Sequence, residues 1–109
     1  MHKIVVLYPP PTDRAHFARY YRETHLPLAA RLPGAVEMGY ALDLDAQGGP
    51  YYAMFEATFA SPESADAAMA SPEGLAVQAD VSHYASGGAI VMGVPLVAVR
   101  AAAARPPLD

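Results

Sequence analysis

The stretch Phe17-Ala-Arg-Tyr-Tyr-Arg-Glu-Thr-His-Leu-Pro-Leu-Ala-Ala-Arg-Leu-Pro-Gly34 decides how the rest of the chain is interpreted. At about 100° per residue, one side of a helix would carry the side chains of Phe17, Tyr20, Tyr21, Thr24, Leu28 and Leu32. The charged side chains of Arg19, Arg22 and Glu23 fall elsewhere. His25 lies at the edge of the apolar side, and Pro27 cannot donate a backbone hydrogen bond. The stretch therefore predicts an amphipathic helix that packs on a core and kinks or loosens beside His25.

Four β-strands are predicted around this helix. Residues 3–8 and 89–94 are apolar on both faces, which is typical of strands covered on two sides. Residues 38–44 alternate in polarity, and residues 51–59 carry aromatic side chains at alternate positions. Because the turn-forming segment 45–50 joins these last two strands, they are expected to form an antiparallel hairpin.

A second helical region is predicted between the third and fourth strands. Ser61-Pro-Glu-Ser64 supplies a hydroxyl cap, a proline in the first turn and an acid near the positive end of a helix that runs to about residue 70. Ser71-Pro-Glu73 repeats this signal. We expect a short break there, and then a further helical turn or two through Leu75, Val77 and Gln78.

The order β-α-β-β-α-β predicts an α+β, ferredoxin-like domain over residues 1–100, with a four-stranded antiparallel sheet and both helices on one face. The other face would be an apolar surface that monomers rarely expose, because the first and fourth strands are apolar on both sides. A second copy packed sheet against sheet would cover it, giving a homodimeric α+β barrel. Residues 101–109 are expected to form an extended or disordered tail.

Composition excludes several classes of function. The chain has 109 residues, of which 53% are hydrophobic and 17% charged, and this leaves room for one domain with a modest core. A net charge of −4 without a basic stripe argues against nucleic-acid binding, and no apolar run is long enough to span a membrane. No signal peptide is recognisable and there is no cysteine, so we expect a cytoplasmic protein.

Residue types and spacing resemble the EthD family of small dimeric α+β barrel proteins over roughly the first hundred residues. The resemblance is carried by residues 7–9, 17–21 with 25–29, 32–34, and 80–81 running into 86–88. It implies the dimeric barrel fold. Members of the family differ in chemistry, so the fold does not define the activity.

His25 is the first candidate for chemistry, because an imidazole with a pKa near 6.5 can take and give a proton at neutral pH. A lone histidine on a helix edge is more often packed or surface-exposed than functional. The resemblance favours a pocket role, since EthD-like proteins carry a histidine at this motif position. The ring is predicted to face a cavity between the first helix and the sheet, within reach of a tyrosine hydroxyl.

Tyrosine phenols and one carboxylate are the other candidates. Tyr40 would face inward from the second strand and could steady an oxyanion beside His25, and Tyr20 and Tyr21 could line the same pocket. Core packing is the more common role for each tyrosine. Glu56 could orient a histidine or serve as a second acid/base group, although a solvated or dimer-edge carboxylate is the more common outcome.

No cofactor or metal is expected. No two histidines have the i, i+4 spacing of a metal-binding helix, and the paired glycines lack the strand-to-helix context of a phosphate loop. His2 and His16 are interpreted as surface residues. His83 is interpreted as peripheral, because relatives usually have a non-titrating residue there.

Two functions from different classes fit these residues. One is a cofactor-free acid/base enzyme of the isomerase, cyclase or decarboxylase type, which acts on a small oxygenated compound with His25 as base. The other is a non-catalytic protein that binds a metabolite in the same pocket. A second titratable group within reach of His25 would favour the enzyme.

Overall fold

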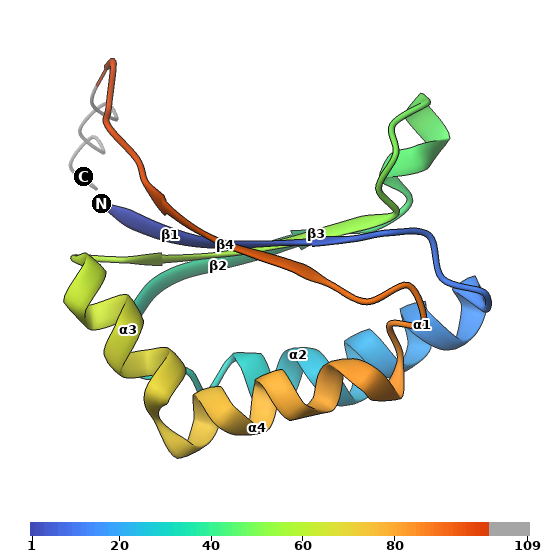
Figure 1. Ribbon diagram of the computed structural model, residues 1–109, viewed down its shortest axis with the longest axis horizontal. Helices are drawn as coiled ribbons and strands as arrows, with labels where there is room; N and C mark the ends of the chain where they lie inside the picture. The colour runs from blue at the N-terminus through green and yellow to red at the C-terminus, as the bar shows by residue number, and fades with distance from the viewer. Residues whose placement is uncertain (101–109) are drawn as a thin grey trace, which may run out of the picture.

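The computed structural model describes residues 1–100, so the predicted tail at 101–109 lies outside the described residues. Helices cover one face of a single sheet (Figure 1). The elements are, in chain order, β1 (His2–Tyr8), α1 (Arg14–Tyr20), the π-helical turn η1 (Tyr21–His25), α2 (Leu26–Ala29), β2 (Ala35–Ala41), the 3-10 turn η2 (Leu44–Gln47), β3 (Ala53–Phe59), α3 (Pro62–Ala70), α4 (Pro72–Asp80), the 3-10 turn η3 (Val81–His83) and β4 (Ile90–Pro95).

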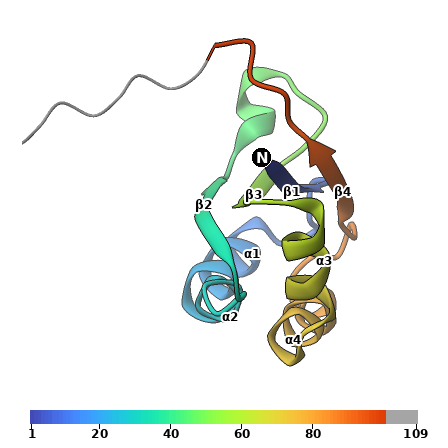
Figure 2. The same cartoon turned by 90° about the vertical axis from the view of Figure 1, so that its left-hand side faces the viewer.

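The sheet has the strand order β2-β3-β1-β4, and every neighbouring pair is antiparallel. Viewed end-on, α1 and α2 lie under the β2 side of the sheet, and α3 and α4 lie under the β4 side (Figure 2). This arrangement confirms the predicted ferredoxin-like fold. Among residues 1–100, none of the helices has the length and apolar character that a membrane crossing requires.

Two predicted boundaries were wrong. The second strand spans Ala35–Ala41 rather than 38–44, because Asp43 adopts a left-handed backbone conformation with φ 57° and leads into η2. The helical segment after Ser71 is also longer than the predicted turn or two. Its start is capped by the Ser71 side chain, which accepts from the Gly74 amide, and it continues to Asp80.

The first helix begins at a polar cap and changes its winding before His25. The Asp13 side chain accepts from the His16 amide and so caps this end of the helix. In η1 the Leu26 amide donates to the Tyr21 carbonyl, five residues back. Because a π turn takes more residues than an α turn, the phase of the helix shifts, so Thr24 is exposed although a straight helix would have placed it inward.

The core lies between the helices and the facing side of the sheet. It is rich in aromatic rings that meet edge to face, such as Tyr8 against Phe17 with ring centroids 5.2 Å apart. Its fully buried large side chains are Tyr8, Phe17, Tyr21, Tyr52 and Phe59.

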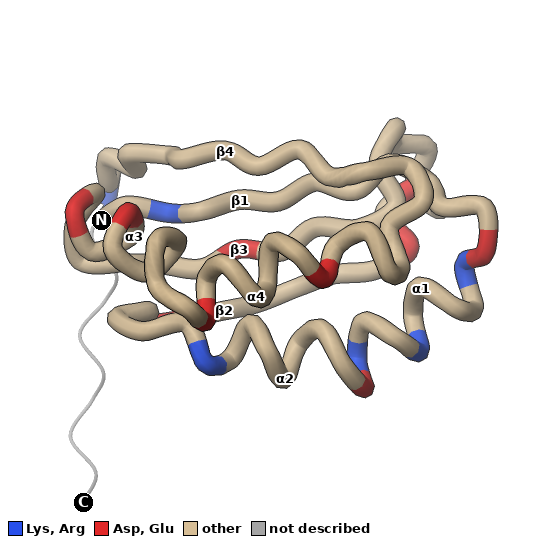
Figure 3. Tube along the Cα trace, turned by 60° about the horizontal axis from the view of Figure 1, so that its bottom comes forward, with Lys and Arg blue, Asp and Glu red and all other residues tan. Residues whose placement is uncertain are grey.

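The opposite face of the sheet is uncovered and largely apolar in residues 1–100. Strand register places Met92 opposite Val5 and Ile90 opposite Leu7 on this face, and both β4 side chains are about 40% exposed. Charged residues lie mainly on the helices and loops, and β4 has none (Figure 3). The sheet therefore presents the bare apolar surface that the sequence predicted.

Candidate functional site

A cavity lies between the helical layer and the sheet. Apolar side chains form most of its wall, among them Ile4, Val6, Phe55, Val77, Val81 and Val91. The enclosed part of the cavity has a volume of about 40 Å³, and the empty space is about 430 Å³ when the open mouth is included. Since one water needs ~10–15 Å³ by that measure, the closed part has room for a few non-hydrogen atoms.

His25 lies on the wall of this cavity at the end of η1 and is only 3% exposed. Its ring stacks on Tyr21, with centroids 5.3 Å apart, and its Nδ1 atom lies 3.0 Å from Oδ2 of Asp80. Because of the π turn, His25 faces the inward side of the helix and Thr24 faces outward. His25 therefore lies between the cavity and the buried Asp80 carboxylate.

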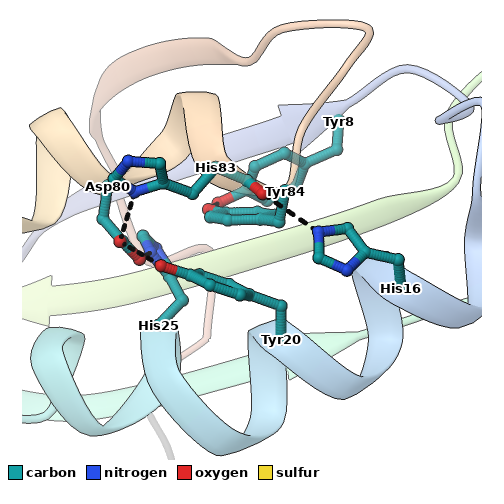
Figure 4. Close-up of polar contacts among 7 residues, drawn as sticks. All are labelled: Tyr8, His16, Tyr20, His25, Asp80, His83 and Tyr84. Carbon is teal, nitrogen blue, oxygen red and sulfur yellow. Dashed lines mark hydrogen bonds and ion pairs between the residues drawn. The ribbon is translucent and has the colours of Figure 1, made fainter.

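Three side chains meet the Asp80 carboxylate at the end of α4 (Figure 4). Besides His25 on Oδ2, the Tyr20 hydroxyl donates to Oδ1 over 2.7 Å and His83 Nδ1 lies 3.0 Å from the same oxygen. Burial by itself would raise the pKa of Asp80, but these hydrogen bonds outweigh it and lower the pKa below its ordinary value. Asp80 is thus ionised at neutral pH.

An ionised carboxylate only accepts hydrogen bonds, so the Nδ1 atom of His25 must carry a proton. Burial lowers the pKa of His25, and the Asp80 carboxylate opposes this without cancelling it. The imidazole is therefore neutral at pH 7, and its Nε2 atom carries the lone pair. Within residues 1–100, no hydrogen-bond donor from the protein occupies Nε2. This is the arrangement of a general base held in one tautomer.

Two further phenols lie beside the histidine. The Tyr8 ring lines the cavity, and its hydroxyl is 2.8 Å from the hydroxyl of Tyr84. The Tyr84 ring lies 4.6 Å from the His25 ring, centroid to centroid. One imidazole and two phenols therefore lie close together beside a cavity whose wall is mostly apolar.

The residues proposed from sequence divide into two groups. Tyr20 and Tyr21 lie beside His25, the first through Asp80 and the second by stacking, but neither is on the cavity wall as the sequence analysis proposed. The structure does not bring Tyr40 or Glu56 to His25, and both line a separate open depression at β2 and β3.

The positions of Tyr40 and Glu56 in their strands explain why neither side chain reaches His25. Tyr40 is on the edge strand β2 and is 45% exposed, and its ring centroid lies 5.8 Å from that of Tyr21. Glu56 is paired in register with Val5, which places it on the uncovered face, where Lys3 Nζ lies 3.1 Å from its carboxylate.

Residues 80–81 helped to carry the family resemblance, but Asp80 was not proposed as a site residue from the sequence. Asp80 ends α4, where the negative end of the helix dipole disfavours a carboxylate. A carboxylate at such a position needs hydrogen-bond donors from other parts of the chain. An acid at the end of a predicted helix was therefore the available signal for a cluster of donors around Asp80. His83 was interpreted as peripheral and its side chain is indeed 64% exposed, but its ring is held by Asp80.

The described residues offer no evident metal site: within 1–100, no three His, Cys, Asp or Glu side chains are grouped so that they could hold a metal ion. The contacts of Asp80 are hydrogen bonds from two imidazoles and a phenol. These contacts suit proton transfer and hydrogen bonding by the chain's own side chains.

These features define a ferredoxin-like α+β domain with a histidine–carboxylate pair beside a cavity between helices and sheet. More particularly, the EthD domain model matches residues 9–88, and the chain belongs to the EthD family. An uncharacterised 11.0 kDa protein from the thcB-thcC intergenic region of Rhodococcus erythropolis is 34% identical over 94 residues, which span 84% of this chain and 91% of that protein.

Solved structures agree with this assignment. An EthD family protein from Bacillus halodurans is 29% identical with a TM-score of 0.81, covering 89% of this chain and 99% of its own. An EthD-like protein from Ralstonia eutropha is 26% identical with a TM-score of 0.70, covering 91% and 94%.

More distant structures share the fold alone. They include a dimeric ferredoxin-like protein of unknown function from Thermobifida fusca, which is 16% identical with a TM-score of 0.67 and covers 87% of this chain and 89% of its own. SnoaB, a cofactor-independent oxygenase from Streptomyces nogalater, is also 16% identical, with a TM-score of 0.64 and coverage of 92% and 94%.

Proposed function

We propose that this protein is a cofactor-free acid/base enzyme that binds a small oxygenated compound in the cavity and uses His25 as its base. The observation that carries the proposal is the position of His25 between an ionised carboxylate and an apolar cavity. Asp80 is the second titratable group within reach of the histidine that an enzyme would need and a simple carrier would not.

In this proposal His25 Nε2 takes a proton from a carbon next to a carbonyl group. Asp80 stabilises the imidazolium that forms and keeps Nδ1 protonated throughout. A hydroxyl of the cavity wall, for which Tyr8 is better placed than Tyr40, stabilises the enolate oxygen. Return of the proton to another carbon completes an isomerisation, and cyclisation or decarboxylation could use the same stabilised enolate.

A non-catalytic metabolite-binding protein is the second candidate. The small volume and mostly apolar wall of the cavity favour it, because a binding protein needs only shape and one or two hydrogen bonds. In that case His25 would hydrogen-bond the ligand and exchange no proton with it.

We also propose that the working form is a homodimer in which a second copy covers the uncovered sheet face. Support comes from the exposed Ile90 and Met92 side chains and from the dimeric ferredoxin-like protein that shares the fold. Each protomer would keep its own cavity, since the cavity lies on the helical side of the sheet.

Hydrogen–deuterium exchange of small cyclic ketones in D₂O tests the enzyme proposal without knowledge of the substrate. The wild-type chain should accelerate exchange next to the carbonyl, and His25→Gln should reduce the acceleration by the roughly 10²–10⁴-fold that general base catalysis supplies. His16→Gln is the matched control, because His16 is on the same helical segment but not on the cavity wall. Ketone binding without accelerated exchange would favour the binding protein.

A further inference from the structure

A short arm, residues 96–100, leaves the sheet after β4. It rises on the uncovered side of the sheet, away from the helices (Figures 1 and 2). The Leu96 amide donates to the Met1 carbonyl over 3.1 Å, which holds the start of the arm beside the beginning of β1. Farther along the arm, Val97 is 83% exposed and Val99 is fully exposed. Two apolar side chains therefore face solvent in a single copy of the chain.

The uncovered face has an open depression at the β2 edge of the sheet. It is lined by Gly39, Tyr40, Ala41, Met54 and Glu56 and has a volume of about 350 Å³. Strand register pairs Gly39 with Glu56 and Ala41 with Met54. Because β2 contributes a glycine and an alanine beside the longer side chains of β3, the hollow can receive an aliphatic side chain from outside.

The arm is too short for Val99 to reach the depression on its own sheet. Pro95, at the base of the arm, is paired with His2, whereas Met54 of the depression is paired with Leu7. The two positions differ by two strand spacings across the sheet and by five residues along it, which is about 20 Å at about 4.8 Å per strand and about 3.4 Å per residue. The four residues that end at Val99 span at most about 14 Å. A second copy packed on the uncovered face can bring its arm there instead.

We propose that two copies exchange their arms, so that residues 96–100 of each copy lie in the depression between β2 and β3 of the other. The proposal rests on the proposed homodimer, and it names the segment of the second copy that contacts this part of the face. A two-fold axis that crosses the strands places the His2 end of one sheet over the Leu7 end of the other, which delivers the arm to the depression.

Charge at the depression agrees with this arrangement. Arg100 carries the only charge of residues 95–100. The Glu56 carboxylate contacts Lys3 through Oε1, but its side chain is still 38% exposed, so its other oxygen can accept from a guanidinium. The arm thus offers aliphatic side chains to the hollow and a cation to the acid beside it.

Disulfide trapping between two single-cysteine variants tests the arm exchange, because the chain has no cysteine of its own. Val97→Cys and Val99→Cys are each co-expressed with Met54→Cys, oxidised and separated by size without reductant. At least one of the two pairs should give a cross-linked dimer, since a disulfide forms only where the Cα atoms come within about 7 Å. Each copy carries a single cysteine, so a contact within one copy cannot give this product.

Leu75→Cys co-expressed with Val99→Cys is the matched control, since Leu75 is equally accessible but lies on α4, on the other side of the sheet. It should not cross-link. Cross-linking of Val99→Cys alone, in the same yield as with Met54→Cys, would show that the two arms meet each other and would overturn the proposal. Absence of a cross-link in both Met54→Cys pairs would also overturn it.

Sedimentation equilibrium supplies a measurement that needs no cysteine. Val99→Asp should raise the dissociation constant of the dimer at least about tenfold, because each dimer loses the burial of two valine side chains. Leu75→Asp should leave it unchanged. A wild-type dimer whose dissociation constant is the same in Val99→Asp would overturn the arm exchange and leave the dimer standing, whereas a monomeric wild type would overturn both. Neither result bears on the hydrogen exchange of ketones, which tests the enzyme proposal by itself.

Discussion

Burial and the Asp80 carboxylate act on the His25 imidazole in opposite directions. Burial disfavours the charged ring, whereas the carboxylate favours it, and the net effect is a lowered pKa. The imidazole ring is therefore neutral at pH 7, and its hydrogen bond to the ionised Asp80 carboxylate fixes its orientation. This combination gives His25 a free lone pair at neutral pH without solvent exposure.

The stability of the protein should fall in mild acid because of His25. Its pKa is lower in the folded state than the ordinary 6.5 of the unfolded chain. Between those two values the unfolded state binds more protons, so the free energy of unfolding falls as the pH is lowered, by at most about 1.4 kcal/mol per pH unit. Urea unfolding at pH 7, 6 and 5 measures this slope.

His25→Gln should lose this dependence between pH 7 and 5, whereas His16→Gln should keep it. Asp80 acts in a different window: its pKa is lowered on folding, so its contribution is present above about pH 4 and is lost below. An equal slope in the wild type and His25→Gln would show that another group titrates.

Removal of the Asp80 charge should disturb both stability and catalysis. Asp80→Asn keeps the size of the side chain but replaces charge-assisted hydrogen bonds to His25 and Tyr20, so we expect a loss of about 2 kcal/mol in the free energy of unfolding. Ketone exchange should fall at least about tenfold, because the histidine tautomer is no longer fixed. Chemical denaturation and the exchange assay measure the two effects.

His83→Gln is the control on the same carboxylate. The His83 side chain is 64% exposed, so its loss should cost less than about 1 kcal/mol and leave exchange within a few-fold of the wild type. If Asp80→Asn behaved like His83→Gln, the carboxylate would have no special role.

The sequence predicted His25 but not its partner, for a physical reason. The proline at position 27 and the edge of an apolar face are local signals within one helix. Asp80 is 55 residues away, and it meets His25 because the fold places the end of α4 beside the end of η1. Its own local signal, an acid at the negative end of a helix, is weak.

At the scale of secondary structure, the change from α1 to η1 decides which side chains face the sheet. The sequence predicted a loosening beside His25, and η1 is that feature. A helix calculated with 100° per residue does not include the extra residue of a π turn. The sequence analysis therefore assigned Thr24 to the wrong side of the helix. All four strands, by contrast, were predicted in the right order, although the second begins and ends about three residues earlier than its alternation suggested.

Close packing at the junction of α3 and α4 gives a prediction for Gly74. This glycine is buried, and a Cβ atom there would meet the backbone of Ala68 and Met69. Gly74→Ala should lower the free energy of unfolding by about 1–3 kcal/mol, because the two helices must move apart. Gly39→Ala is the matched control, since a Cβ atom at Gly39 meets nothing within 4 Å. Thermal unfolding of both variants measures the difference, and equal melting temperatures would contradict the packing account.

At the scale of the whole molecule, the uncovered sheet face predicts the state of assembly. Sedimentation should give about 23 kDa, twice the chain mass of 11.5 kDa. Met92→Lys should shift the protein towards monomer, because it places a charge on the apolar face. Leu75→Lys, at an exposed position on α4, should remain dimeric. A wild type that is monomeric at micromolar concentration would rule out the barrel.

The central claim is that His25 is neutral, with its proton on Nδ1 in the hydrogen bond to Asp80 and its lone pair on Nε2. Long-range ¹H–¹⁵N NMR of the histidine side chains at pH 7 tests it most directly, with His25→Gln used to assign the signals. We predict a protonated nitrogen at Nδ1 and an unprotonated nitrogen at Nε2. A ring protonated on Nε2 alone, or on both nitrogens, would contradict the account.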